Sequence, residues 1–210
     1  RETERIRRQI RNRTGAISIV FDRICEVLVE AGYLAQGESE LELTPHGYTL
    51  RRIYGERDLL VAECLRRQVW SGLDAPGLAA IIATLVYEPR RDDTPVYPAD
   101  LPRGEFASAL DTTRRWQKKL SEIETSHQVA PKGDLSPQLA MAMYHWALGH
   151  RLENVLDMRD IQAGDFVRWC KQVIDVLDQI ITIGEGPIHT TALDARAAVF
   201  RGIVALSSVA

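Results

Sequence analysis

The chain has 210 residues, of which 45% are hydrophobic and 26% are charged, and its formal net charge is −3. This composition is that of a soluble globular protein, with enough residues for one large domain or one domain with an appendage. The slight acidic excess excludes a global basic field, so any contact with nucleic acid depends on local basic patches.

The cysteines and the lengths of the apolar runs indicate the cellular compartment of the protein. Cys25, Cys64 and Cys170 are odd in number and far apart, which argues against a disulfide framework and for a reducing cytosol. No apolar run approaches the length of a transmembrane helix and no signal peptide opens the chain, so we expect a cytoplasmic location and no membrane partner. Because the chain starts at Arg1 and not at Met, we expect it to be a piece of a longer protein.

The N-terminal quarter, residues 1–57, reads as a lead-in segment. Arg1–Arg13 carries six arginines and two glutamates and is expected to be helical, with a face that is either solvated or in contact with nucleic acid or another part of the protein. The apolar spacing from Ile17 to Ala31 predicts a helix that Gly32 ends. The alternating run Leu41–Thr44, followed by Pro45-His46-Gly47, predicts a small wing before a new helix.

From Asp58 to Ala210 the pattern is one helix after another, with almost no strand signal. Asp74 is expected to cap a helix that Pro89 ends, and Ser136 to cap one that Gly149 ends. The predicted helices run from 58 to 72, 74 to 89, 106 to 123, 136 to 149, 152 to 158, 164 to 183 and 187 to 204. Helices joined by short loops predict an all-α fold, an irregular bundle with a small wing-like N-terminal segment.

The helix predicted from Gly164 is the most informative. Its apolar residues recur at three- and four-residue spacing, and Gly164-Asp165 is expected to supply the break and an N-cap. Arg168 then falls in the first turn, off the apolar stripe, where a cation faces the positive end of the helix dipole. Lys171, Gln172 and Asp175 follow at i+3, i+4 and i+7 and continue a polar ridge, whose basic start suits a phosphate chain or a carboxylate partner. The alternative is an ordinary amphipathic helix with a solvated face.

Two further residues stand out beside this helix. Glu88 is expected in the last turn of the helix that Asp74 starts, where the negative end of the dipole disfavours a carboxylate. Glu88 and Arg168 would therefore suit each other if those helix ends meet, or would suit a shared ligand. Trp169, next to Arg168, either stacks a base or packs in the core.

Several kinds of chemistry are missing from the sequence. It has no phosphate-cradling glycine loop followed by Lys and Ser or Thr, so we expect no ATP binding by these residues. No two histidines fall at i, i+4, and none lies near a cysteine, so no metal site is predicted. No nucleophile stands beside a base, and the cysteines read as small core residues. We therefore expect no catalytic residue and no cofactor in this segment.

The order of motifs resembles the DSHCT domain, which closes the superkiller-type RNA helicases. The resemblance rests on Leu59–Leu65, Leu78–Glu88, Trp146–Gly149 and Gly164–Arg168. The preceding residues, Leu43–Gly47 and Arg51–Tyr54, resemble the corresponding segment of the actinobacterial HelY type. The resemblance covers roughly Ile17 to Ala210, and several motifs in the same order make it specific.

The resemblance implies a function as well as a fold. It implies a helical domain, 58–210, that packs on two RecA-like motor domains of the same chain, which hold ATP and Mg²⁺. A long ratchet helix would form one wall of a channel that guides single-stranded RNA 3′ to 5′, and an RNA-degrading nuclease would be a partner. Arg168 matches the RNA-facing Arg of the family, although Asp165–Val167 departs from its motif. Glu88 matches an RNA-facing acid, and the Pro89 that follows it is a departure.

A protein-docking module is the alternative function. Such a module would recruit a nuclease or another partner and touch no nucleic acid. A large basic groove bordered by Arg168 and Lys171 would favour RNA guiding, whereas an exposed apolar patch would favour docking. The sequence leaves RNA and DNA open as the nucleic acid of the ATP-dependent helicase that would contain this segment.

Overall fold

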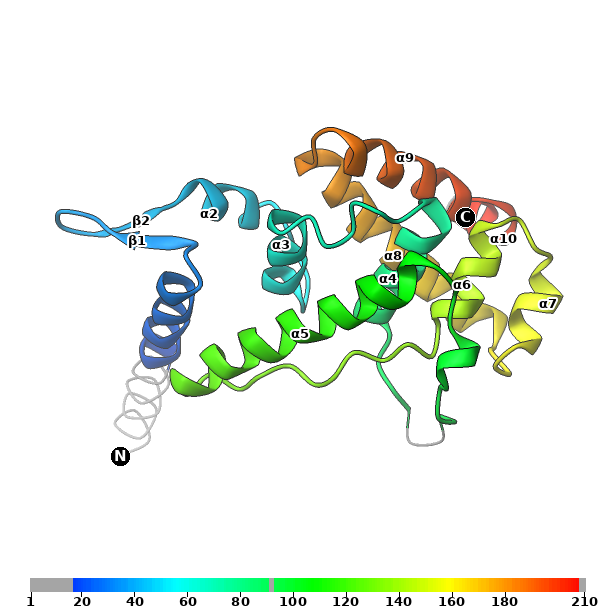
Figure 1. Ribbon diagram of the computed structural model, residues 1–210, viewed down its shortest axis with the longest axis horizontal. Helices are drawn as coiled ribbons and strands as arrows, with labels where there is room; N and C mark the ends of the chain where they lie inside the picture. The colour runs from blue at the N-terminus through cyan, green and yellow to red at the C-terminus, as the bar shows by residue number, and fades with distance from the viewer. Residues whose placement is uncertain (1–16, 91–92, 208–210) are drawn as a thin grey trace, which may run out of the picture.

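The computed structural model describes residues 17–90 and 93–207, and this part of the chain is predominantly helical, with one small hairpin. The all-α prediction is therefore confirmed. The predicted helix at Arg1–Arg13 lies outside the described residues. The hairpin stands at one end of the molecule and a cluster of helices at the other, with α5 running between them (Figure 1).

The first described helix, residues 17–30, ends as the sequence predicts. Gly32 has a φ of +81°, a left-handed conformation that glycine adopts readily, and the backbone N–H of Tyr33 donates to the carbonyl of Leu28 at 2.8 Å. The predicted apolar face of this helix is largely uncovered by the described residues. Ile17 and Phe21 are 70% and 64% exposed.

The predicted wing is a two-stranded antiparallel hairpin. Strands β1 (Leu34–Gln36) and β2 (Leu41–Leu43) pair with Leu34 opposite Leu43. Helix α2 (Pro45–Leu50) follows directly, and the Thr44 side chain caps it by accepting from the Gly47 N–H at 3.1 Å.

Helix α4 (Ala75–Val86) is the centre of the bundle. Asp74 caps it as predicted, accepting from the Gly77 N–H at 2.8 Å. Every residue from Gly77 to Leu85 is buried. A helix that is apolar all round must be covered on all sides. Its neighbours are α5 (Glu105–Ser126), α6 (Ala140–Ala147), α8 (Ala163–Ile183) and α9 (Pro187–Val199).

Four further helical elements complete the described fold. They are α3 (Asp58–Arg66), the short 3-10 helix η1 (Pro98–Asp100), α7 (Leu152–Asp157) and α10 (Gly202–Leu206). None of the described helices has the length and apolar character needed to cross a membrane.

The predicted end of α3 and the predicted start of α6 are wrong. Helix α3 stops at Arg66, well before Gly72, and Gln68 adopts a positive φ of 54° just after it. Ser136 caps no helix, because residues 137–139 form a turn first and α6 begins at Ala140.

The predicted last helix is two helices. It breaks at Phe200 and Arg201, where the Arg201 backbone is extended. The Arg201 guanidinium stacks 3.6 Å from the Trp146 ring centre and donates to the Trp146 carbonyl at 2.6 Å. This tertiary contact turns the chain, and the sequence period alone does not reveal it.

A buried carboxylate links the hairpin to α3. Glu63 is 3% exposed; it accepts from the Tyr33 hydroxyl at 2.8 Å and from Arg67 Nε at 2.9 Å. Burial and the bond to Glu63 raise the pKa of the Tyr33 hydroxyl. A buried charge is stable in a fold only when its hydrogen bonds are made, so this contact fixes the start of the wing on the bundle.

Tyr33→Phe is therefore expected to lower the free energy of unfolding by about 1–3 kcal/mol, because it removes a buried donor from a carboxylate. Chemical denaturation checks this value. Tyr48→Phe is the matched control, since Tyr48 is 53% exposed and its ring contact with Arg51 survives the change. Equal stability of the two variants would contradict the role given to Glu63.

A second link joins the helix 17–30 to the end of α5. His127 places Nε2 at 2.7 Å from Glu30 and Nδ1 at 3.1 Å from Glu26. Arg23 contributes beside them by donating to the Gln128 side chain at 2.5 Å. The hydrogen bond to Glu30, helped by Glu26, raises the pKa of His127.

The His127 link should be pH-dependent. A raised folded-state pKa means that the stabilisation is fully present below the ordinary value of about 6.5 and is lost as the pH rises through the folded pKa. The melting temperature of the wild type should thus exceed that of His127→Gln at about pH 5.5, with the difference shrinking towards about pH 8.5. A constant difference over this range would show that His127 acts through packing alone.

Candidate nucleic-acid interface

Helix α8 carries the predicted site, and its apolar stripe is confirmed. The buried residues are Phe166, Trp169, Cys170, Val173, Ile174, Leu177 and Ile180. The predicted N-cap is wrong, because the helix begins at Ala163 with Gln162 at the cap position. Asp165 is the third helical residue, and Arg168 is in the second turn. The dipole effect falls off within one turn, so Arg168 is less disfavoured than the sequence implies.

Arg168 lies on the surface beside an acid of its own helix. Its side chain is 58% exposed, and Nη2 is 3.7 Å from Asp165 Oδ1. Its guanidinium carbon lies 5.5 Å from the Trp169 ring centre. An exposed pair at this distance is weak, so most of the hydrogen-bonding capacity of Arg168 remains available to a ligand.

Trp169 lies beneath this surface. Its side chain is 3% exposed and packs on the Tyr87 ring with a centre-to-centre distance of 4.8 Å. The guanidinium carbon of Arg90 lies 5.2 Å from the Trp169 ring centre. Arg90 Nη2 also pairs with Asp165 Oδ2 at 2.6 Å. The burial favours core packing over base stacking, because no free ring face is left for a base.

Glu88 lies outside the helix in which it was predicted. Helix α4 ends at Val86 and Tyr87 is extended, so the prediction that Glu88 opposes the helix dipole is wrong. Tyr87 leaves the helix to pack on Trp169 and to donate to Asp93 at 2.9 Å. Pro89 also disfavours a helical conformation for Glu88. No ion pair joins Glu88 and Arg168 among residues 17–90 and 93–207.

Glu88 and Gln172 line the same groove. The groove has a volume of about 360 Å³ and lies between α8, the end of α4 and residues 53–58. Arg168 precedes Gln172 by one helical turn on the same face of α8, so the cation stands at the approach to the groove. The structure thus brings Glu88, Gln172 and Arg168 to one side of the bundle.

The groove is acidic, which differs from the basic groove expected for RNA guiding. Its charged lining residues are Glu56, Arg57, Asp58, Glu88 and Asp175. Burial raises the pKa of Asp175, with a smaller contribution from Asp178. The amides of Gln172 and Gln179 are the neutral polar groups of the α8 wall.

Lys171 points away from this groove. Its Nζ donates to the Ser207 carbonyl at 2.9 Å, at the end of α10. Residues 171 and 172 are successive on a helix and do not share a face, so Lys171 leaves the expected ridge of Arg168, Lys171, Gln172 and Asp175. Gln172 and Asp175 line the groove, and Arg168 shares their face of α8.

The sequence analysis did not assign Tyr54, Gln179 or Arg90 to this surface. The Tyr54 backbone N–H donates to the Gln179 side chain at 2.7 Å, which ties the loop 53–58 to α8, and the Tyr54 ring is 72% exposed. Arg90 holds Asp165 from a loop far away in sequence. The i, i+3 spacing of Asp165 and Arg168 is the one local signal that could have shown a pair here.

The described residues contain no group of three or more His, Cys, Asp or Glu side chains arranged to hold a metal ion. Cys64 and Cys170 are buried and Cys25 is half-buried, and all three are free thiols. Burial raises the pKa of Cys64 to about 12, so this thiol is a core residue and not a nucleophile.

The amino-acid sequence of these helices matches a known family. The model of the DSHCT (NUC185) domain matches residues 40–207. The chain belongs to the DSHCT family. The boundary predicted at residues 57 and 58 remains a prediction, and α3 begins at Asp58.

Helicases are among the relatives of this DSHCT chain. It is 36% identical to the probable helicase HelY of Mycobacterium leprae and 34% identical to that of Mycobacterium tuberculosis, over 99% of this chain and 24% of each relative. It is 28% identical to the chloroplastic DExH-box ATP-dependent RNA helicase DExH15 of Arabidopsis thaliana, over 65% of this chain and 12% of that protein. The chain thus spans about a quarter of the length of the HelY relatives.

Substitutions at two neighbouring residues of α8 should differ widely in how much they lower stability. Arg168→Ala removes an exposed, weakly paired side chain and should change the free energy of unfolding by no more than about 0.5 kcal/mol. Trp169→Ala empties a buried ring site and should cost about 3–5 kcal/mol. Thermal and chemical unfolding measure both, and a large loss in Arg168→Ala would make Arg168 a structural ion-pair residue.

Proposed function

We propose that this DSHCT domain guides a single strand of RNA in an ATP-dependent helicase whose RecA-like motor domains lie elsewhere in the same polypeptide. The observation that carries the proposal is the alignment of Arg168 and Gln172 on one face of α8, beside the groove that Glu88 lines. The relatives of this chain are helicases, which supports the parent activity.

The charges of the site suit weak contacts with a single strand of RNA that moves along the domain. Arg168 is the cation at the groove entrance and would contact a phosphate. The acidic and amide groups behind it would face base edges, since Asp and Glu accept from exocyclic amines and Gln donates and accepts. A strand held by few phosphate contacts binds weakly and with a shallow dependence on salt, which suits translocation.

In this proposal the domain performs no catalysis. ATP and Mg²⁺ would be bound by the motor domains, and Arg168, Gln172 and Glu88 would keep the strand from slipping between steps. Trp169 would act from below by supporting Arg168, and Lys171 would hold α10. An RNA-degrading nuclease would take the product of the parent enzyme.

The test uses a helicase that contains this chain with its motor domains. Arg168→Ala should slow unwinding of an RNA duplex with a 3′ overhang by roughly fivefold, the effect of losing a contact worth about 1 kcal/mol. Arg115→Ala is the matched control, because Arg115 is 70% exposed on α5 and pairs only within its helix. Unwinding at the wild-type rate in Arg168→Ala would overturn the assignment, and a DNA duplex of the same sequence separates RNA from DNA guiding.

The exposed apolar face of the helix 17–30 favours the second candidate, a protein-docking module. It lies on the lead-in segment and away from the α8 surface (Figure 1). If docking is the main function, Phe21→Ser should impair nuclease-coupled RNA decay while Arg168→Ala has no effect. The reverse result supports RNA guiding.

A further inference from the structure

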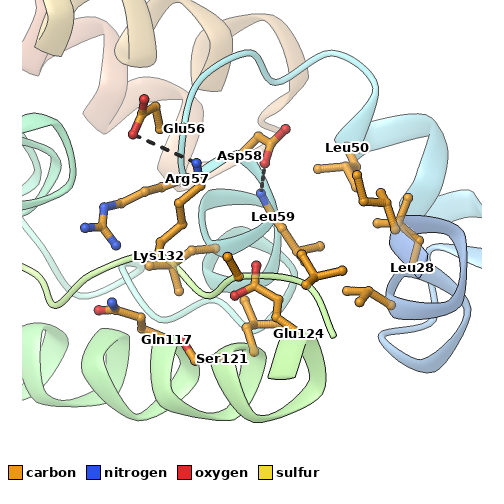
Figure 2. A pocket seen from close by; sticks show the side chains of 16 residues that line it. Leu28, Leu50, Glu56, Arg57, Asp58, Leu59, Gln117, Ser121, Glu124 and Lys132 are labelled. Atoms are coloured by element: carbon orange, nitrogen blue, oxygen red, sulfur yellow. Dashed lines mark hydrogen bonds and ion pairs between the residues drawn. The ribbon is translucent and has the colours of Figure 1, made fainter. Parts of the chain in front are cut away.

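Helix α5 presents two faces of different character. Its inner face lines a largely aliphatic pocket of about 390 Å³, which it shares with the helix 17–30, α2 and α3 (Figure 2). Gln117 and Glu124 stand on this side of the helix (Figure 2). Lys118 and Lys119 follow Gln117 by one and two residues, so their side chains are rotated by about 100° and about 200° away from it. Both lysines are exposed and belong to the outer face of α5.

Cations dominate the outer face in the middle turns of α5. Four exposed cations form what we call the α5 cationic surface: Arg67 of α3 and Arg114, Lys118 and Lys119 of α5. Arg115 lies among them, but it pairs with Asp111 at 2.8 Å. Glu122 is the acid one turn further along. Within the described residues 17–90 and 93–207, no ion pair reaches the three α5 members of the surface. Most of its positive charge is therefore uncompensated.

The ring of Trp116 holds two of these cations close together. The Arg67 guanidinium carbon lies 4.6 Å from the ring centre and Lys119 Nζ lies 4.8 Å from it. An indole ring attracts cations, which offsets the repulsion between two like charges. Arg67 donates its Nε to Glu63 at 2.9 Å, and no described residue accepts from either of its Nη groups. The two cations are thus positioned before a ligand binds, which lowers the cost of ordering them.

We propose that the α5 cationic surface holds the phosphate backbone of a single strand of RNA, outside the α8 groove. The proposal rests on RNA being the ligand of the domain, as in the proposed function, and not on a contact with Arg168. Residues four apart on a helix are separated by about 6 Å along its axis. Arg114 and Lys118 can therefore reach successive phosphates of one strand.

The distribution of charge favours this surface over the α8 groove as the main phosphate contact. The groove is lined by four acids and one arginine, so it offers little attraction to a polyanion. Since the net charge of the chain is −3, attraction of RNA depends on a local cationic surface. Lys and Arg contacts to phosphates carry no sequence information, so the surface is expected to bind RNA of any sequence.

RNA binding by the chain as a function of salt tests the proposal. The probe is a fluorescein-labelled oligouridine of roughly 12 nucleotides, and its anisotropy is measured from about 50 to about 200 mM salt. Lys118→Gln combined with Lys119→Gln should weaken binding by about fivefold or more at the lowest salt. The slope of log affinity against log salt should fall by about 1.4, because each phosphate contact on a single strand contributes about 0.7.

Arg51→Gln combined with Arg52→Gln is the matched control. It removes two adjacent exposed cations at the end of α2 and should leave the salt slope unchanged. Equal losses in the two double variants would show that only the net charge matters, and the α5 surface would then have no specific role. The same conclusion would follow if the wild type failed to bind the oligouridine at about 50 mM salt.

Arg168→Ala separates this proposal from the proposed function. If Arg168→Ala weakens RNA binding and the double lysine variant does not, the α5 surface is ruled out while the α8 assignment stands. A loss in the double lysine variant alone supports the α5 surface independently of Arg168. Poly-glutamate is the competitor that represents an acidic protein. Displacement of the RNA by an equal concentration of poly-glutamate charges would make this a protein-docking surface and refute the proposal.

Discussion

The burial of α4 on all sides is the constraint that organises this molecule. Its residues from Gly77 to Leu85 have no solvent-facing side, so α5, α6, α8 and α9 must all pack on it. The end of α4 is fixed as a result. Tyr87 leaves the helix there and packs on Trp169 of α8. This ring contact is what brings the Glu88 loop and the Arg168 face of α8 to the same side of the bundle.

Local sequence patterns predicted the elements where local chemistry decides them. The stripe on α8, the Asp74 cap, the Gly32 stop and the wing before Pro45 all depend on residues within a few positions of each other, and all are confirmed. Helix ends that depend on distant contacts were misplaced. The break before α10 falls where Arg201 stacks on Trp146, 55 positions earlier in the chain, and where Gly202 adopts a positive φ of 51°.

The candidate site was predictable only in part for the same reason. The spacing of α8 gave Arg168 and Gln172 a common face. Glu88 was singled out by its expected place in the last turn of α4, which is wrong, and by the family resemblance. Lys171 was assigned to that face by proximity in sequence, although one residue along a helix rotates the side chain by about 100°. Two of the four acids that line the groove, Glu56 and Asp58, come from the loop before α3 and from its first residue, and reach the groove through tertiary folding. No pattern within α8 contains that information.

The three residues from Glu56 to Asp58 line both the groove beside α8 and the aliphatic pocket beneath the lead-in segment. This one segment of the chain is thus a wall shared by two cavities. A substitution at any of these three residues therefore changes the lining of both cavities at once.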